Sequence, residues 1–219
     1  MAASLGSLAE ALRTVPDEAR HDWGQVHAKF SGWLASNRAG LCQGILSDLS
    51  SLQRSSPGFL EAGARETSSH FVWRLFDDPA DYFSIWINEY KDEALVGSYV
   101  DSIHNHRYDF CTTILNGWYS HERYSVSLAW PDRHGSAILD GTRRAVTGDS
   151  LLLRAHDFHR IPEFDKGTLT LLVKSRERQP WSFSINPETG VVNRHVPANA
   201  RLSLLEAKLK LISRRGVPS

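Results

Sequence analysis

Two histidines separated by one residue, His104 and His106, have the spacing that most directly indicates chemistry in this chain. Successive side chains of an extended strand point to opposite faces, so these two imidazoles would share a face and could bind one metal ion. A third histidine, His159, follows later in the chain, after the run Gly148-Asp149-Ser150. The sequence therefore predicts a three-histidine metal site assembled from two strands.

The same alternation sorts the residues that follow the histidine pair. If the histidines face inward, Tyr108 and Phe110 face inward as well, whereas Asp109 and Cys111 face outward. Asp109 is then a poor fourth ligand despite its proximity. Three neutral imidazoles leave the charge of a divalent metal uncancelled and leave coordination positions open, which suits an anionic substrate and O2. We therefore favour Fe(II) over zinc as the cofactor.

The spacing around this pair resembles the first part of the cupin signature, G(X)5HXH(X)3-4E(X)6G. His104, His106 and Gly117 match that pattern, while Gly97 stands one residue too early. Phe110 occupies the position of the family's glutamate, so the usual carboxylate ligand is missing. The resemblance nevertheless implies a small β-barrel with a metal at its mouth.

The second part of the cupin signature, G(X)5PXG(X)2H, resembles the segment from Gly148 to His159. Its outer spacing is kept, although Arg154 and His156 replace the inner proline and glycine. This resemblance places His159 in the position of the third ligand. His156 lies three residues earlier and remains an alternative third ligand at this point.

Among cupins, the runs SIHNHRYDFC and FHRI look most like the thiol dioxygenases of the cysteine dioxygenase type, over roughly residues 70 to 185. That resemblance implies ferrous iron held by three histidines, with a small anionic thiol and O2 as substrates and a sulfinate as product. It implies that an arginine, here Arg74, holds the substrate carboxylate; the alternative for Arg74 is an ion pair with Asp77 or Asp81. Some relatives carry a cysteine–tyrosine cross-link, but Cys111 is out of phase and we expect none.

Four residues are the candidates for binding the substrate: Arg74, Phe110, Trp86 and Lys174. Tyr108 is a candidate catalytic residue together with Arg74, because its hydroxyl faces inward and can reach bound oxygen or substrate; a packing role is its alternative. Isolated histidines are usually surface or core residues, and we assign that role to the following six: His21, His27, His70, His121, His134 and His195.

Composition indicates one soluble globular domain. The chain has 219 residues with 25 basic and 25 acidic side chains, so no net charge draws it toward nucleic acid or membrane. Two cysteines do not indicate a disulfide framework. The first residues lack the pattern of a secretion signal, and no apolar run approaches about 18 residues. We expect a cytoplasmic monomer or homodimer that binds a small molecule and O2.

The pattern of apolar residues changes twice along the chain. Trp23, Val26, Phe30 and Leu34 recur at helical spacing, and Thr14 begins a capping-box-like run. Candidate strands cover 71–76, 82–90, 111–119, 124–130, 150–154 and 169–175, with turns at 140–141 and 187–190. A last helix carries an apolar stripe formed by Leu202, Leu205, Leu209 and Ile212.

The predicted fold class is mainly β, a cupin or jelly-roll barrel with N-terminal helices and a C-terminal helix. We divide the chain into a helical segment (1–66), the barrel (67–197) and the last helix (198–219), packed as one structural domain. Three functional classes stay open: a thiol dioxygenase, another metal-dependent cupin oxygenase or isomerase, and a ligand-binding cupin without catalysis. No signature of a different enzyme class is present.

Overall fold

The computed structural model describes residues 3–67, 69–80, 82–91, 102–129, 131–197 and 201–214. Helices occupy the N-terminal part, namely α1 (Leu5–Arg13), α2 (Trp23–Asn37), α3 (Leu41–Ser55) and α4 (Pro57–Gly63). Short 3-10 turns, Asp17–Ala19 and Arg38–Gly40, interrupt them. Thr14 ends α1 instead of starting a helix, because the side chain of Ser4 caps α1 and that of Asp22 caps α2.

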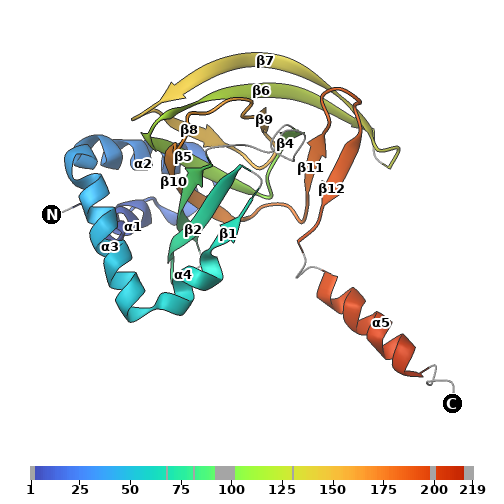
Figure 1. Ribbon diagram of the computed structural model, residues 1–219, viewed down its shortest axis with the longest axis horizontal. Helices are drawn as coiled ribbons and strands as arrows, with labels where there is room; N and C mark the ends of the chain where they lie inside the picture. The colour runs from blue at the N-terminus through green and yellow to red at the C-terminus, as the bar shows by residue number, and fades with distance from the viewer. Residues whose placement is uncertain are drawn as a thin grey trace.

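Two six-stranded antiparallel sheets follow (Figure 1). The first contains, in spatial order, β1 (Arg65–Glu66), β2 (His70–Asp77), β3 (Phe83–Tyr90), β10 (Leu169–Glu177), β5 (Tyr108–Asn116) and β8 (Ser150–Leu153). The second contains β12 (Val192–His195), β11 (Ser182–Ile185), β4 (Ile103–His104), β9 (Phe158–Arg160), β6 (Trp118–Ala129) and β7 (His134–Val146). This arrangement confirms the predicted fold class, a mainly β jelly-roll with helical ends.

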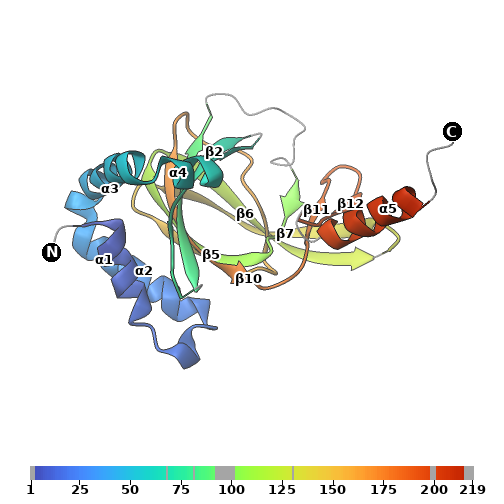
Figure 2. The same cartoon turned by 90° about the horizontal axis from the view of Figure 1, so that it is seen from below.

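The helices α1 to α3 cover the outer face of the first sheet (Figure 2). The buried stripe of α2, which includes Trp23 and Phe30, packs on the sheet residues Cys111, Leu171 and Val173. The alternate residues of the same strands face the interior between the two sheets. The first sheet is therefore covered on both faces, and its inner face is available to build a site.

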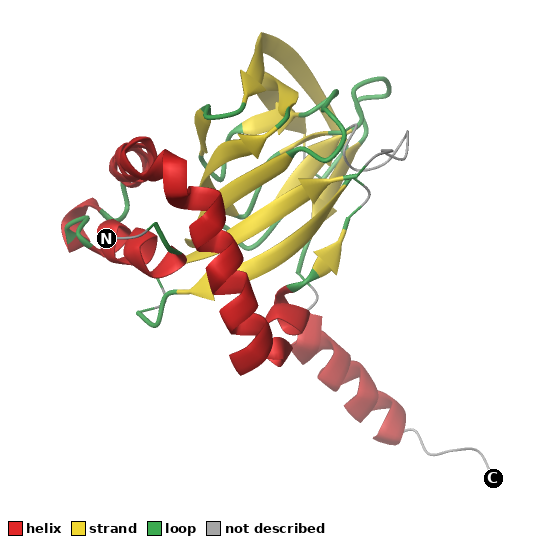
Figure 3. Ribbon diagram, turned by 60° about the vertical axis from the view of Figure 1, so that its left-hand side comes forward, coloured by secondary structure: helices red, strands yellow, loops and turns green. Residues whose placement is uncertain are grey.

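Helix α5 (Leu202–Arg214) extends away from the rest of the molecule (Figure 3). The side chains of Leu202, Leu205 and Leu209 are between 52 and 57 % exposed. Within the described residues, none of the helices has both the length and the apolar character that crossing a bilayer requires.

Three local expectations are corrected by the structure. Asp140 and Gly141 lie inside β7, where Asp140 is an extra residue opposite the step from Arg123 to Tyr124, so this pair marks a β-bulge and not a turn. The residues from β4 to β5 do not form one strand, because the chain passes from the second sheet to the first between them. The predicted strand ranges cover none of β1, β4, β7, β9, β11 and β12.

Candidate metal centre

The three predicted ligands come together from separate segments of the chain. His104 ends β4, His159 is its direct partner in β9, and His106 lies in the link between β4 and β5. One ring nitrogen from each lies within 4.8 Å of the others, and Nε2 of His106 is 2.8 Å from Nε2 of His159. The three histidines thus form a metal-binding group between the two sheets.

This group fits a divalent metal ion in both geometry and protonation. Two imidazole nitrogens bound to one ion at about 2.1 Å and at a right angle lie about 3 Å apart, close to the observed His106–His159 distance. Burial lowers the pKa of His104 to about 4 and holds the pKa values of His106 and His159 well below their usual value. All three side chains are therefore neutral near pH 7, the form that binds metal.

Two hydrogen bonds orient the rings. Nδ1 of His104 donates to the carbonyl of Ser102 at 3.0 Å, and Nδ1 of His159 lies 3.2 Å from Nε2 of His121. Both contacts leave the Nε2 atoms of His104 and His159 directed to the common centre. Partners of this kind fix the tautomer and orientation of metal-binding imidazoles. His121 therefore supports the site, although the sequence had suggested only a surface or core role for it.

The alternation of inward and outward residues along a strand is the sequence signal that could have identified His121 as an inward-facing residue. In β6, Tyr119 and His121 are buried whereas Trp118 and Ser120 are only partly so, so the strand turns one face inward where it passes the ligands. The strand predicted from the sequence begins only at Tyr124, so His121 lies outside it.

We expect His121→Phe to weaken metal binding about 10- to 100-fold, because the variant keeps the ring shape but removes the contact to His159. Titration of the metal-free protein with Fe(II) or Zn(II) measures the dissociation constant. His156→Phe is the matched control, since the His156 side chain is 76 % exposed. An unchanged dissociation constant for His121→Phe would show that the tautomer of His159 is set by another group.

Further polar contacts fix the backbone around the ligands. Asn105 accepts from the amide of Phe183 at 2.7 Å, and Gln179 donates from Nε2 to the carbonyl of His106 at 2.6 Å and to that of Ala155 at 3.0 Å. Asp109 accepts from the amide of Ala155 at 2.7 Å. Asp109 is thus directed away from the metal group and holds the loop that leads to His159.

The other ligand candidate, His156, stands apart from this group. Its side chain is exposed and lies 3.7 Å from Asp157. The metal-binding group contains His159 in its place. Cys111 packs against the N-terminal helices on the outer face of the sheet, and burial raises the pKa of its thiol.

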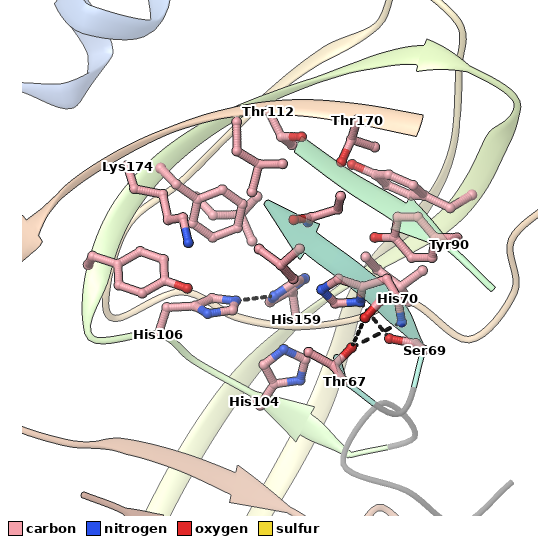
Figure 4. A pocket seen from close by; sticks show the side chains of 18 of the residues that line it. Thr67, Ser69, His70, Tyr90, His104, His106, Thr112, His159, Thr170 and Lys174 are labelled. Carbon is pink, nitrogen blue, oxygen red and sulfur yellow. Dashed lines mark hydrogen bonds between the residues drawn. The ribbon is translucent and has the colours of Figure 1, made fainter. Parts of the chain in front are cut away.

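A cavity of about 270 Å³ opens beside the histidines, between the inner faces of the two sheets (Figure 4). The residues that line it are mostly aromatic, aliphatic or hydroxyl-bearing, and the basic ones are Arg65, Arg107 and Lys174. Among the described residues, no carboxylate lines the cavity. Tyr108 and Phe110 both lie on its wall, as their predicted parity requires.

Lys174 is the most unusual residue of the cavity. Its side chain is buried, with Nζ 3.6 Å from the ring centre of Trp86 and 5.0 Å from that of Tyr108. It makes no ion pair or hydrogen bond with the described part of the chain. Burial lowers the pKa of Lys174 well below its usual value, and the nearby Arg65 adds to this effect.

Arg74 does not line the cavity. Its guanidinium pairs with Asp77 at 2.8 Å and lies 4.9 Å from the ring centre of Phe59. The start of the Arg74 side chain packs closely on α4, since a Cβ added at Gly63 would come within 2.6 Å of the Arg74 Cβ. The ion pair considered as an alternative from the sequence is therefore present. The arginines on the wall are Arg65 and Arg107, and neither was predicted from the sequence; Arg65 stands in β1, which is only two residues long.

Trp86, a predicted substrate-binding residue, is not among the residues that line the cavity, but its ring lies close to three cations. Its ring is 3.6 Å from Lys174 Nζ and 5.8 Å from the guanidinium carbons of both Arg65 and Arg74. Its indole N–H donates to Ser84 at 2.6 Å. Contacts of this kind are cation–π interactions, which here fix the ring and the lysine relative to each other.

His70, also assigned a surface or core role from the sequence, lines the cavity near Tyr90. Its pKa is lowered to about 4, first by burial and then by the charges of Arg65 and Lys174. The unfolded chain, with a histidine pKa near 6.5, binds the proton first as the pH falls. The contribution of His70 to the free energy of unfolding is therefore complete above about pH 6.5. It is lost progressively as the pH falls to about 4.

We expect the metal-free protein to lose stability over this pH window, by up to about 3 kcal/mol from His70 alone. His70→Phe should flatten part of the dependence of Tm on pH between about pH 7 and pH 4.5. His156→Phe, at an exposed position, is the control. Equal slopes for His70→Phe and the unaltered chain would mean that His70 is not held neutral by the fold.

Comparisons with known proteins add a structural likeness only. No family model and no curated protein sequence matches the chain. Among solved structures, KdgF from Halomonas sp. is 12 % identical over 52 % of this chain and 88 % of its own, with a TM-score of 0.37. An oxalate decarboxylase variant from Bacillus subtilis is 14 % identical over 51 % and 26 % of the two chains, with a TM-score of 0.36.

A third solved structure is the DMSP lyase DddQ from Ruegeria pomeroyi DSS-3. It is 13 % identical to this chain, over 58 % of this chain and 59 % of its own, with a TM-score of 0.37. Likenesses at these identities and TM-scores carry no conclusion about activity, because one fold hosts many reactions. The chemistry of this chain has to be inferred from the histidine group and the cavity beside it.

Proposed function

We propose that the protein is a metal-dependent cupin-type dioxygenase that binds Fe(II) through His104, His106 and His159 and oxidises a small anionic thiol to a sulfinate. The observation that carries this proposal is the composition of the cavity. Three neutral imidazoles and a buried lysine line it, and no carboxylate does among the described residues.

The electrostatics of such a cavity favour an anionic substrate. Neutral ligands leave the full charge of a divalent ion in place, and a buried ammonium without a counter-ion is costly. Lys174 is in that situation, and Arg65 adds a second positive charge nearby. An anion that enters the cavity offsets these charges, so its binding is coupled to full protonation of Lys174.

The chemistry of the proposed reaction is R–S⁻ + O2 → R–SO2⁻, in which sulfur is oxidised and both oxygen atoms enter the product. Bound ferrous iron supplies the coordination of sulfur and oxygen that side chains alone lack. Lys174 and Arg65 hold the anionic end of the substrate at the wall next to the histidines. The ring centre of Tyr108 lies 5.0 Å from Nζ of Lys174, and Tyr108 places its hydroxyl beside these two cations. Phe110 excludes water on the metal side.

Oxygen uptake tests the proposal. Iron-loaded protein should consume O2 when a thiol with a carboxylate or sulfonate group is added, in equal amounts with the sulfinate formed, whereas matched acids that carry a hydroxyl in place of the thiol should give no uptake. His106→Ala is the control for iron that is not held at the site. Manganese-loaded protein is a useful comparison because Mn(II) centres are described for the Bacillus oxalate decarboxylase. Absence of thiol-dependent uptake at full iron occupancy would refute the thiol reading.

One observation favours a second candidate, a metal-assisted isomerase or lyase. The lowered pKa of Lys174 makes its amine available as a base beside the metal group. A substrate with an acidic C–H bond next to a carbonyl group would then lose a proton to Lys174. Conversion of such a substrate under strictly anaerobic conditions would favour this candidate, because the dioxygenase needs O2.

A further inference from the structure

One wall of the cavity is formed by alternate residues of β10. Lys174, Leu172 and Thr170 line the cavity, while Val173 and Leu171 face the N-terminal helices. Four residue steps of extended strand lead from Thr170 to Lys174, a distance of about 13 Å along the backbone. In Figure 4, Lys174 lies toward the left of the cavity and Thr170 toward the right, with the histidine group below both. The cavity therefore has two ends that differ in chemistry.

The end opposite Lys174 is polar and uncharged. Asn88 is the direct partner of Thr170 across β3 and β10, and Tyr90 follows on the same face of β3. The three side chains are 9, 1 and 6 % exposed, for Asn88, Thr170 and Tyr90 in turn. Their groups make no hydrogen bond with any described residue. Thr112, by contrast, is bonded to Tyr119 nearby.

Buried polar side chains are nearly always hydrogen-bonded, and these three border the cavity without a partner for their polar groups in the described part of the chain. Three such groups that share one end of a cavity therefore indicate a ligand that satisfies them. The cavity, at about 270 Å³, lies near the lower end of small-molecule sites, about 300–1,000 Å³. Between its two ends the wall is apolar at Leu172, which lies between Thr170 and Lys174 on the inner face of β10, and this suits a hydrocarbon linker.

We infer that the substrate is an extended molecule with an anionic group at the Lys174 end and an uncharged hydrogen-bonding group, such as a carboxamide, at the Asn88 end. This inference rests on the proposed function for the anionic end and adds the second group. An amide side chain offers both a donor and an acceptor, so Asn88 can form paired hydrogen bonds with a carboxamide, and the hydroxyls of Thr170 and Tyr90 complete them.

The three side chains at this end carry no formal charge of their own. The charges of Arg65 and Lys174 lie against Trp86, which stands two residues from Asn88 on the same face of β3. The end itself therefore offers hydrogen-bond donors and acceptors, which an uncharged amide group matches.

A set of linear carboxylates tests the inference without any reaction. Each probe carries a terminal carboxamide, with three, five or seven methylenes before the carboxylate, and each control replaces the carboxamide by an isopropyl group of the same shape. Calorimetric titration of the full chain under argon gives the dissociation constants. At the best length, we expect the carboxamide to bind about tenfold more tightly than its isopropyl control.

Variants locate this preference. Asn88→Leu should abolish it and Thr170→Val, which is isosteric, should reduce it, whereas Asn116→Leu at an exposed position should leave it intact. Lys174→Met should weaken both members of each pair by the same factor. The carboxamide NMR signal of Asn88, assigned by its loss in Asn88→Leu, should shift with the amide probe and not with the control.

Equal binding of both members at every length would overturn the inference, as would a preference that survives both Asn88→Leu and Thr170→Val. Binding of no probe would also count against it, since the second end would then add nothing measurable. These outcomes are separate from the proposed oxidation. Thiol-dependent O2 uptake without a carboxamide preference would support the proposed function and contradict the inference about the second end. A carboxamide preference without thiol-dependent O2 uptake would support the inference and contradict the proposed function.

Discussion

Replacement of His104, His106 or His159 by alanine is expected to remove most of the bound metal and to weaken metal affinity by more than about 100-fold, since even indirect supports of a metal site are worth 10- to 100-fold. The reason is geometric. Each histidine contributes one nitrogen to a group that spans only 4.8 Å, and no carboxylate in the described part of the cavity can replace it. Metal analysis of anaerobically purified protein measures the loss.

His156→Ala is the matched control, because its exposed ring lies outside the metal-binding group. It should retain one ion per chain. The fold of the three ligand variants should persist, since the core clusters do not include the ligands; circular dichroism checks this. Loss of metal in His156→Ala together with retention in His159→Ala would show that the third ligand is His156.

The residues that could be anticipated from the sequence are those whose chemistry is carried by local spacing. Alternation along one extended segment placed Tyr108 and Phe110 on the cavity wall and Asp109 on the other face, although the segment is interrupted after His104. Helical spacing identified the buried stripe of α2 that begins at Trp23. Burial of alternate residues is a local pattern, so it survived an inaccurate strand boundary.

What escaped prediction depends on contacts between distant or very short segments. The strands β4 and β9 have two and three residues, too few to show a period, and β7 is mostly exposed and interrupted by a bulge. The choice between Arg74 and Arg65 depended on which arginine had a carboxylate within reach. Asp77 lies three residues from Arg74 and forms the ion pair that the sequence had left open as an alternative, so the fold decided between the two roles.

Lys174→Met is expected to raise the KM for an anionic thiol by about 10- to 100-fold, whereas Arg74→Met should leave KM within about twofold. A hydrogen bond to a charged group is worth about 1.5–3 kcal/mol, and Lys174 is the buried cation that faces the cavity. Arg74 is occupied by Asp77 and is turned toward α4. The sequence resemblance had assigned the substrate carboxylate to Arg74, whereas the structure indicates Lys174. The two variants therefore show which of these residues binds the anionic group.

Steady-state oxygen uptake with iron-loaded variants measures both constants, and isopropyl-terminated carboxylates used as competitive inhibitors report binding without turnover. A residue that only binds the anionic end raises KM with little change in kcat, because the contact exists before and during the reaction. If Lys174 is also the base of the second candidate function, kcat should fall as well. A large KM effect in Arg74→Met with none in Lys174→Met would restore Arg74 to the substrate site and would require the Asp77 pair to open when substrate binds.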